Sequence, residues 1–152
     1  MDILLLGSGG REHAIAVALK ASPLCDALYV APGNGGTAAI ATNIKLDIND
    51  PAAVADYAAE HGVGLVVIGP EAPLVAGVAD AVRAKGIPAF GPGAQGAQME
   101  GSKRFAKEFM ERHGIPTAAY RSFTEQAGAE AYVAQRFAAD VKVLVVKADG
   151  LA

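Results

Sequence analysis

The sequence predicts an α/β fold built on a doubly wound parallel sheet, and three observations support that prediction. Short apolar runs alternate with stretches of helical spacing up to about residue 92. One run, residues 64–68 (GLVVI), is apolar throughout, as is typical of a strand buried on both faces of a parallel sheet. The segments that follow the apolar runs are rich in glycine and proline. Strands that alternate with helices in this way pair in parallel through right-handed crossovers.

The composition is that of a globular protein. The 152 residues are 52% hydrophobic and 19% charged, which suffices for one domain with a core, or for one domain and part of another. No apolar run approaches the length of a bilayer span, and the first residues lack the features of a secretory signal. We therefore expect no membrane partner and a cytoplasmic location.

Charge is distributed unevenly along the chain, whose net charge is −3. Residues 1–100 carry five basic and ten acidic side chains, whereas residues 101–152 carry eight basic and six acidic ones. The second stretch is therefore the better binder of polyanions. Neither stretch has the basic stripe of a nucleic-acid surface, so we expect no nucleic-acid partner.

The elements of the first hundred residues follow from apolar spacing and helix caps. Strands are expected over residues 2–6, 27–30, 44–46 and 64–68. Helices are expected over residues 11–21 and 51–61, and from the segment GPEAPL to Lys85. Asp50 is a suitable N-cap for the second helix, and Pro51 is a suitable first residue. The loops at the carboxyl ends of the strands are expected to form the site.

The pattern changes at about Gly101. Beyond it we expect a helix from Ser102 to His113, a strand over 118–121, a helix over 124–137 and a strand over 141–147. These elements are the start of a second unit. We therefore divide the chain into residues 1–100 and 101–152.

The sequence offers no metal site. No group of His, Cys, Asp and Glu has the spacing of zinc ligands. His61 and His113 each precede a glycine at the end of an expected helix, so we interpret them as capping residues. Cys25 is the one cysteine and cannot form an internal disulfide.

The glycine-rich loop of residues 7–12 (GSGGRE) is the first candidate site. Gly7 and Gly9 match the first two glycines of a dinucleotide-binding fingerprint, but Glu12 occupies the position of the third. The second expected strand also lacks the acidic residue that would bind a ribose, so a nicotinamide cofactor is disfavoured. Free backbone N–H groups at a helix start, with Arg11 beside them, instead suit a single phosphate. A tight turn with no ligand is the alternative.

Three charged residues are the other candidates. Glu71 lies between two prolines after a buried strand, where it suits the vicinal hydroxyls of a ribose or the start of the next helix. Lys103 lies at a helix start, where a cation opposes the helix dipole, and Lys147 ends an apolar strand. Both lysines suit a bound anion. The alternative for Lys103 is a solvated surface charge, and the alternative for Lys147 is a charge on an edge strand.

Successive motifs give the chain a specific resemblance. In order they are GSGGREHA, APGNGGT, GPEAPL, FGP, EGSKRFAKEFMERHGIPTA, the pair Phe123 and Thr124, and VVKADGLA. Together they span essentially the whole chain, and they resemble the phosphoribosylamine-glycine ligases of the ATP-grasp superfamily. That family joins glycine to 5-phosphoribosylamine in purine biosynthesis and consumes ATP with Mg2+.

The resemblance implies a Rossmann-like pre-ATP-grasp domain over residues 1–100 and the start of an α+β ATP-grasp domain after it. The ligands it implies for the sugar phosphate are Gly7, Gly9, Gly10, Arg11, Glu12, Pro32, Gly33 and Asn34. Glu71 would bind the ribose hydroxyls, and Lys103 and Lys147 would bind the phosphates of ATP. In the family, ATP phosphorylates the glycine carboxylate, and the amine of phosphoribosylamine attacks the acyl phosphate.

The series of motifs is shorter than the family pattern. Family members continue past KADGLA through a glycine-rich phosphate loop, an adenine-binding strand and the Glu and Asn ligands of Mg2+. We therefore expect this chain to be the N-terminal portion of a ligase, inactive by itself. ATP-dependent synthesis of glycinamide ribonucleotide by the purified chain would contradict this expectation. A non-catalytic module that binds a sugar phosphate or a nucleotide is the alternative function.

Overall fold

The computed structural model describes residues 1–150. They form two compact units, of which the first is Met1–Gly101 and the second begins at Ser102. Within residues 1–150, no helix is both long enough and apolar enough to cross a membrane.

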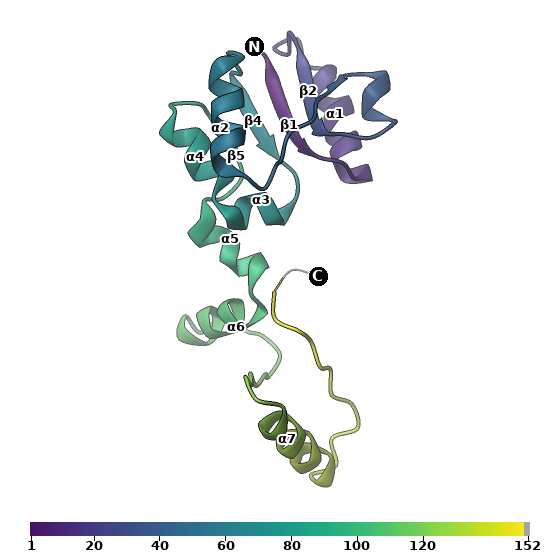
Figure 1. Cartoon of the computed structure of the whole chain (residues 1–152). Helices are drawn as coiled ribbons and strands as arrows, with labels where there is room; N and C mark the ends of the chain where they lie inside the picture. The colour runs from purple at the N-terminus through teal and green to yellow at the C-terminus, as the bar shows by residue number, and fades with distance from the viewer. Residues whose placement is uncertain (151–152) are drawn as a thin grey trace. The chain divides into compact units, whose positions relative to one another are not determined.

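The first unit is built on a five-stranded sheet in which every strand pair is parallel. The strand order is β3-β2-β1-β4-β5, with β1 (Ile3–Gly7) in the centre (Figure 1). The other strands are β2 (Leu28–Pro32), β3 (Thr42–Asn43), β4 (Leu65–Ile68) and β5 (Ala89–Phe90). Because the chain moves outward from β1 first on one side and then on the other, the predicted doubly wound parallel sheet is confirmed.

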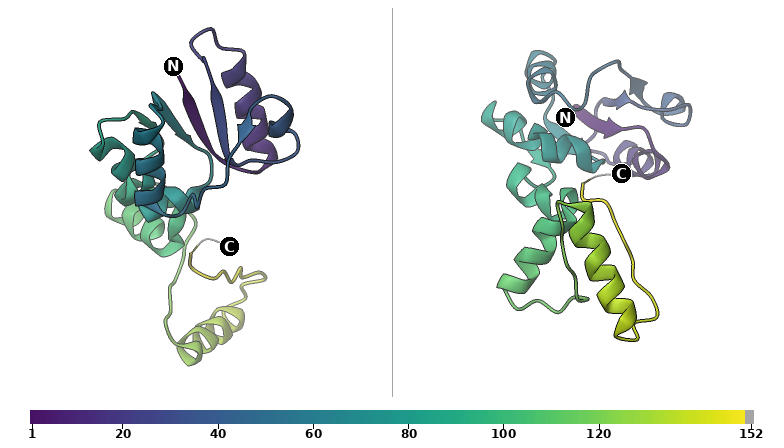
Figure 2. Two further views of the ribbon diagram at one scale, coloured as in Figure 1. Left: turned by 45° about the horizontal axis from the view of Figure 1, so that its top comes forward. Right: turned by 60° about the horizontal axis from the view of Figure 1, so that its bottom comes forward.

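Helices cover both faces of this sheet. On one face lie α1 (Gly10–Lys20) and the short 3-10 helix η1 (Thr37–Ala39). On the other face lie α2 (Pro51–Glu60), α3 (Glu71–Ala76), α4 (Val78–Ala84) and α5 (Ala94–Gly101). Figure 2 shows α1 in purple on the opposite side of the sheet from α2 and α4 in teal. The unit therefore has three layers.

The central strand explains why both faces are apolar. Successive side chains of a strand point to opposite faces, so Ile3 and Leu5 pack toward α1, whereas Leu4 and Leu6 pack toward α2 and α4. Each of these four residues is buried. The continuous apolar run at the start of the chain is thus the signature of a strand covered on both sides.

The third strand differs from its prediction. It was expected over residues 44–46, but the structure has it at Thr42–Asn43, where it pairs with Tyr29 and Val30 of β2. Ile44 and Leu46 instead pack on the core beneath the loop that leads to α2. Ile44 still donates its N–H to the carbonyl of Val30 at 2.9 Å, so the pairing with β2 reaches one residue past the strand. Leu46 lies in the loop, where its alternation with polar residues reflects burial and not pairing in the sheet.

Two helices of the first unit were also predicted imperfectly. The single helix expected to end at Lys85 is divided at Gly77, which adopts a left-handed conformation with φ of +94°. A residue with a β-carbon rarely adopts that conformation, so the glycine ends α3 and α4 begins after it. Helix α5 was not predicted, because its buried surface is the single alanine Ala97 and its spacing gave no apolar face.

The described part of the second unit contains two helices, α6 (Lys103–Arg112) and α7 (Gln126–Ala138). Both were predicted. The strands predicted over 118–121 and 141–147 were wrong, because neither segment has a backbone ladder with another segment of residues 102–150. A β-prone sequence forms a strand only where a neighbouring strand supplies its hydrogen bonds.

Candidate substrate-binding site

The loop after β1 presents backbone donors at the carboxyl edge of the sheet. Gly9 is the N-cap of α1, and the first helical hydrogen bond runs from the N–H of His13 to the carbonyl of Gly9 over 3.0 Å. The N–H groups of Gly10, Arg11 and Glu12 precede that bond and therefore have no partner within the helix. They lie at the positive end of the α1 dipole, where an anion is favoured.

Glu12 fills the space between the ends of β1 and β4. Its side chain is 6% exposed, and its Oε2 accepts the N–H of Gly9 at 2.8 Å. A β-carbon added at Gly7 would overlap Glu12 Cγ, and one added at Gly69 would lie 2.5 Å from Oε1. The glutamate therefore occupies volume that two glycines leave free. The carboxylate of Glu12 faces the interior, and its hydrogen bond with the N–H of Gly9 holds the loop in place.

Arg11 connects the loop after β1 with the loop after β4. Its Nε donates to Glu12 Oε1 at 2.9 Å, and its Nη2 donates to the carbonyl of Gly69 at 2.6 Å. Its Nη1 lies 3.2 Å from Oε1 of Glu71. The contacts with Glu12 and Glu71 raise the pKa of Arg11, the hydrogen bond to Glu12 most of all. The Arg11 side chain is 57% exposed, so it is held in place while it stays accessible to solvent.

Glu71 is the exposed acid of this edge. It is the first residue of α3, and its carboxylate is 44% exposed. Its own backbone N–H, followed by the hydrogen bond from Arg11, lowers the pKa of this carboxyl below its usual value of 4.5. Glu71 is therefore an ionised acceptor at neutral pH. A ribose hydroxyl is a donor that such a carboxylate can accept.

Asn34 ties the loop after β2 to the loop after β1. Its Nδ2 donates to the carbonyl of Ser8 at 2.8 Å and to that of Gly9 at 3.3 Å. Its Oδ1 accepts the N–H of Gly36 at 2.8 Å and that of Thr37 at 3.0 Å. All of the side chain's hydrogen-bonding capacity is thus used within the protein. Asn34 shapes two loops at once.

Two residues that the sequence analysis missed complete this loop. The buried hydroxyl of Thr37 accepts the N–H of Asn34 and lies 2.8 Å from Oδ1 of Asn43. Asn43 Nδ2 donates to the carbonyl of Asn34 at 2.9 Å. Gly33 has φ of +73°, and a β-carbon there would overlap the Asn43 side chain. The spacing of Asn34 and Thr37 is that of a side-chain turn, which was the available signal.

In the second unit, Asp149 contacts the start of α6. Ser102 caps α6 by accepting the N–H of Phe105 at 3.0 Å, and its hydroxyl donates to Oδ2 of Asp149 at 3.0 Å. The N–H of Arg104 donates to Asp149 Oδ1 at 3.1 Å and, more than any other cause, lowers the pKa of that carboxyl. Sequence analysis missed Asp149, although an acid suits a helix N-terminus.

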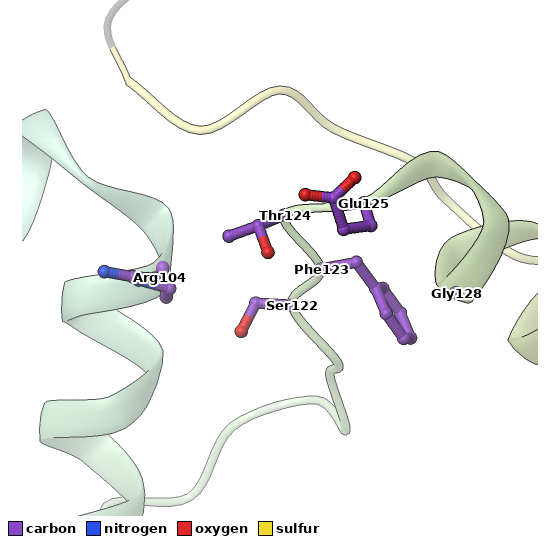
Figure 3. A pocket seen from close by; sticks show the side chains of 6 residues that line it. All are labelled: Arg104, Ser122, Phe123, Thr124, Glu125 and Gly128. Atoms are coloured by element: carbon purple, nitrogen blue, oxygen red, sulfur yellow. The ribbon is translucent and has the colours of Figure 1, made fainter.

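The predicted lysines lie on these two joined segments. Lys103 Nζ donates to the carbonyl of Gly150 at 2.7 Å. Lys147 precedes Asp149 by two residues and is exposed. A cavity of about 260 Å³ lies in the same unit, lined by Arg104 of α6, residues 122–125 and Gly128 of α7 (Figure 3). Its lining carries one cation, Arg104, and one carboxylate, Glu125, and Arg104 pairs with Glu108 of its own helix over 3.6 Å.

Two of the three histidines end helices. His61 follows α2 as its C-cap, with Nδ1 2.9 Å from the carbonyl of Tyr57 and its ring stacked on the Tyr57 ring. His113 is the C-cap of α6 and packs on Phe109. The prediction that both are capping residues is confirmed. Residues 1–150 contain no group of three His, Cys, Asp or Glu side chains placed to hold a metal ion.

The predicted residues of the first unit thus meet at one edge of its sheet. Arg11, Glu12, Asn34 and Glu71 are linked by the contacts above, although 60 residues separate Arg11 from Glu71. The reversal of strand order between β1 and β4 places their loops side by side, which is where open α/β sheets bind ligands.

Comparisons with known proteins follow the same division of the chain. The family model described as phosphoribosylglycinamide synthetase, N domain, matches residues 1–100, and the model of the ATP-grasp (A) domain of that synthetase matches residues 101–152. The chain belongs to the phosphoribosylglycinamide synthetase family. The resemblance found in the sequence motifs is confirmed.

Curated relatives within the phosphoribosylglycinamide synthetase family carry the name phosphoribosylamine-glycine ligase. One from Mesorhizobium japonicum is 55% identical over 152 residues, and one from Yersinia pestis is 51% identical over 154 residues. Each alignment covers 100% of this chain and 35% of the relative. The chain therefore spans about a third of the length of these synthetases.

Solved structures agree with this membership. The crystal structure of phosphoribosylamine-glycine ligase from Thermotoga maritima is 29% identical, with a TM-score of 0.69 over 99% of this chain and 34% of that one. N5-carboxyaminoimidazole ribonucleotide synthetase from Thermus thermophilus is 19% identical, with a TM-score of 0.65 over 88% of this chain and 36% of that one. The second likeness shows the fold alone.

Proposed function

We propose that this chain supplies the 5-phosphoribosylamine site of a phosphoribosylamine-glycine ligase. That enzyme joins glycine to 5-phosphoribosylamine, with ATP converted to ADP and phosphate, in purine biosynthesis. The observation that carries the proposal is the bridge made by Arg11, which links the first turn of α1 to Glu71 across the point where the strand order reverses. One end of that bridge suits a phosphate and the other suits sugar hydroxyls.

The phosphate of the substrate would bind at the start of α1. The N–H groups of Gly10, Arg11 and Glu12 would donate to its oxygens, since they have no helical partner. Arg11 would add a charge-assisted contact from its exposed edge. Glu71 would accept hydroxyls of the ribose. With both ends of the sugar phosphate fixed, its amine would be held in one orientation for attack on the activated glycine.

The remaining predicted residues would shape the site. Gly7 and Gly9 leave room for the Glu12 side chain, which in turn fixes Arg11. Pro32, Gly33 and Asn34 form the loop that Asn34 holds against the carbonyl of Ser8. We assign Gly7, Gly9, Pro32, Gly33, Asn34 and the side chain of Glu12 a role in the geometry of the site. We assign contact with the ligand to the first amides of α1, to the Arg11 side chain and to Glu71.

ATP would act in the second unit. Lys103 and Lys147 suit its phosphates, and the contact of Lys103 with Gly150 shows that its ammonium reaches the segment that follows Lys147. ATP supplies the phosphoryl group that activates the glycine carboxylate. Residues 1–150 provide no cluster of metal ligands, so no residue among them is assigned to Mg2+. These small-molecule partners lead us to propose a cytoplasmic location.

Replacement of Arg11 tests the proposal. Ribose 5-phosphate keeps both the phosphate and the hydroxyls, so its Kd for the chain can be measured by calorimetry. We expect Arg11→Gln to raise that Kd about two- to fivefold, the range for an exposed charged contact. Lys20→Gln is the matched control, because it removes the same charge at the other end of α1. Lys20 lies nine positions beyond Arg11, which is about 14 Å along the helix. That distance exceeds the Debye length of about 8 Å, so the charge of Lys20 is screened from a phosphate at the start of α1. Equal effects of the two variants, or no binding by the unaltered chain, would refute the proposal.

A further inference from the structure

Arg11 is held by two carboxylates that differ in their freedom to move. Glu12 is 6% exposed and fixed at both oxygens, one by Arg11 Nε and the other by the N–H of Gly9. Glu71 is 44% exposed and touches the guanidinium through a single contact of 3.2 Å. An exposed pair with one contact is weak. Glu71 is therefore the partner that can leave Arg11 without disturbing the loop.

We propose that the Arg11–Glu71 pair is a specificity device that favours a ligand carrying both a phosphate and a vicinal diol. The proposal rests on the function proposed above and names the feature of the ligand that this site selects. While Glu71 lies on Nη1, its negative charge repels an incoming phosphate and occupies one donor of Arg11. A vicinal diol offers the carboxylate two O–H donors in exchange. Nη1 then becomes available to the phosphate.

The contacts that remain explain why the exchange leaves the site intact. Nε stays on Glu12 and Nη2 stays on the carbonyl of Gly69, so the guanidinium keeps its plane and position. An anion without a diol offers Glu71 no pair of O–H donors, so it does not release Arg11 Nη1 from the carboxylate. It would meet Arg11 with Glu71 still in place, and it would bear the repulsion between its own charge and the carboxylate. Discrimination thus comes from an unfavourable contact as well as a favourable one.

The device predicts opposite responses to one substitution. Glu71→Gln removes the negative charge and weakens the contact with Arg11, so inorganic phosphate should bind about two- to fivefold more tightly. The same substitution replaces a carboxylate by a poorer acceptor for the diol. Ribose 5-phosphate should therefore bind more weakly. Charge removal alone, by contrast, would strengthen the binding of both ligands.

The experiment compares three probes on the 152-residue chain. Kd values for inorganic phosphate, ribose 5-phosphate and 2-deoxyribose 5-phosphate are taken from the shift of the Gly10 amide in a nitrogen-15 titration. The last two probes carry the same phosphate but differ in the vicinal diol. Glu60→Gln is the matched control, because Glu60 ends α2 and so lies before β4, at the amino edge of the sheet. It should change none of the three Kd values.

The outcomes separate this inference from the function on which it rests. The unaltered chain should prefer the ribose compound over the 2-deoxyribose compound, and Glu71→Gln should abolish that preference while tightening phosphate binding. If the chain binds ribose 5-phosphate but Glu71→Gln shifts all three Kd values in the same direction, the inference is wrong and the proposed function stands. If the unaltered chain binds no ribose 5-phosphate, both are wrong. A wild-type chain that binds both sugar phosphates equally overturns the inference without any variant.

Discussion

The side-chain amide of Asn34 donates to the backbone carbonyl of Ser8 over 2.8 Å, so the loop after β2 is fastened to the loop after β1. The same side chain closes its own turn by accepting two N–H groups, those of Gly36 and Thr37. One residue thus sets both the shape of one loop and its position against the other. This arrangement fixes the loop at the start of α1, where we propose that the phosphate binds.

Asn34→Asp should separate these two roles. An aspartate keeps the acceptor that closes the turn but lacks the Nδ2 donor to Ser8 and Gly9. We expect weaker binding of ribose 5-phosphate with most of the stability retained. Asn34→Ala removes both functions and should lower the free energy of unfolding by about 1–3 kcal/mol. Denaturant unfolding and calorimetry check the pair. The same stability loss in both variants would mean that the tie to Ser8, and not the turn, carries the stabilisation.

Gly69→Ala should destabilise the first unit. The added β-carbon would lie 2.5 Å from Oε1 of Glu12, which is held by Arg11 and cannot move away freely. Overpacking of this kind costs about 1–3 kcal/mol. Gly35→Ala is the control, because a β-carbon at Gly35 meets nothing within 4 Å. Denaturant midpoints that shift equally in the two variants would show that the space around Glu12 is not the cause.

Asp149 should make the second unit sensitive to acid. Its pKa is lower in the folded chain than the usual 3.8, so the ionised form stabilises its docking at α6. That stabilisation is present above pH 3.8 and is lost as the pH falls through the folded pKa. The nitrogen-15 shift of the Arg104 amide should follow this change with a midpoint below 3.8.

Two variants check the assignment of that titration. Asp149→Asn should flatten the Arg104 curve, whereas Asp140→Asn should leave it as it is, because Asp140 pairs with Lys142 instead. A midpoint at or above 3.8 in the unaltered chain would contradict the docking of Asp149 on α6.

The segment 142–147 should exchange its amide hydrogens quickly. Val143, Val145 and Val146 are between 73% and 83% exposed, and no backbone bond to these residues exists within residues 1–150. Amides of β1 should be protected far more strongly, since β1 lies in the centre of the sheet. A dilution series distinguishes protection by pairing between chains, which exposed β-prone runs favour, from protection within one chain. If residues 142–147 are protected as strongly as β1 at the lowest concentration, the segment does form a ladder within one chain and the prediction is wrong.

The sequence was sufficient to predict the sheet and most of its helices, because burial on both faces leaves a strong apolar signal at β1 and β4. It was less accurate at β3, which lies two residues earlier than predicted and pairs with β2 no further than Ile44, and it gave no bounds for the two-residue strand β5. It also failed over 118–121 and 141–147, because β-propensity cannot show whether a partner strand exists. Gly77 divides a helix through its backbone conformation, which apolar spacing does not record.

The site was predicted as separate residues and not as a network. Arg11 and Glu71 were both candidates, but their contact depends on the adjacency of β1 and β4, which no local pattern contains. Glu12 was noticed because it breaks a glycine fingerprint, whereas its burial between Gly7 and Gly69 is a property of the folded sheet. The binding of ATP by Lys103 and Lys147 stays a prediction, as does the binding of a sugar phosphate by the loop before α1.

A nitrogen-15 titration of the unaltered chain with ribose 5-phosphate tests whether the sugar phosphate binds at the start of α1. We expect the largest shifts on the amides of Gly10, Arg11 and Glu12, with a further change at Glu71 and none over residues 102–150. Saturable shifts confined to residues 102–150, or no saturable shift in the first turn of α1, would contradict the assignment of the sugar-phosphate site to the carboxyl edge of the sheet.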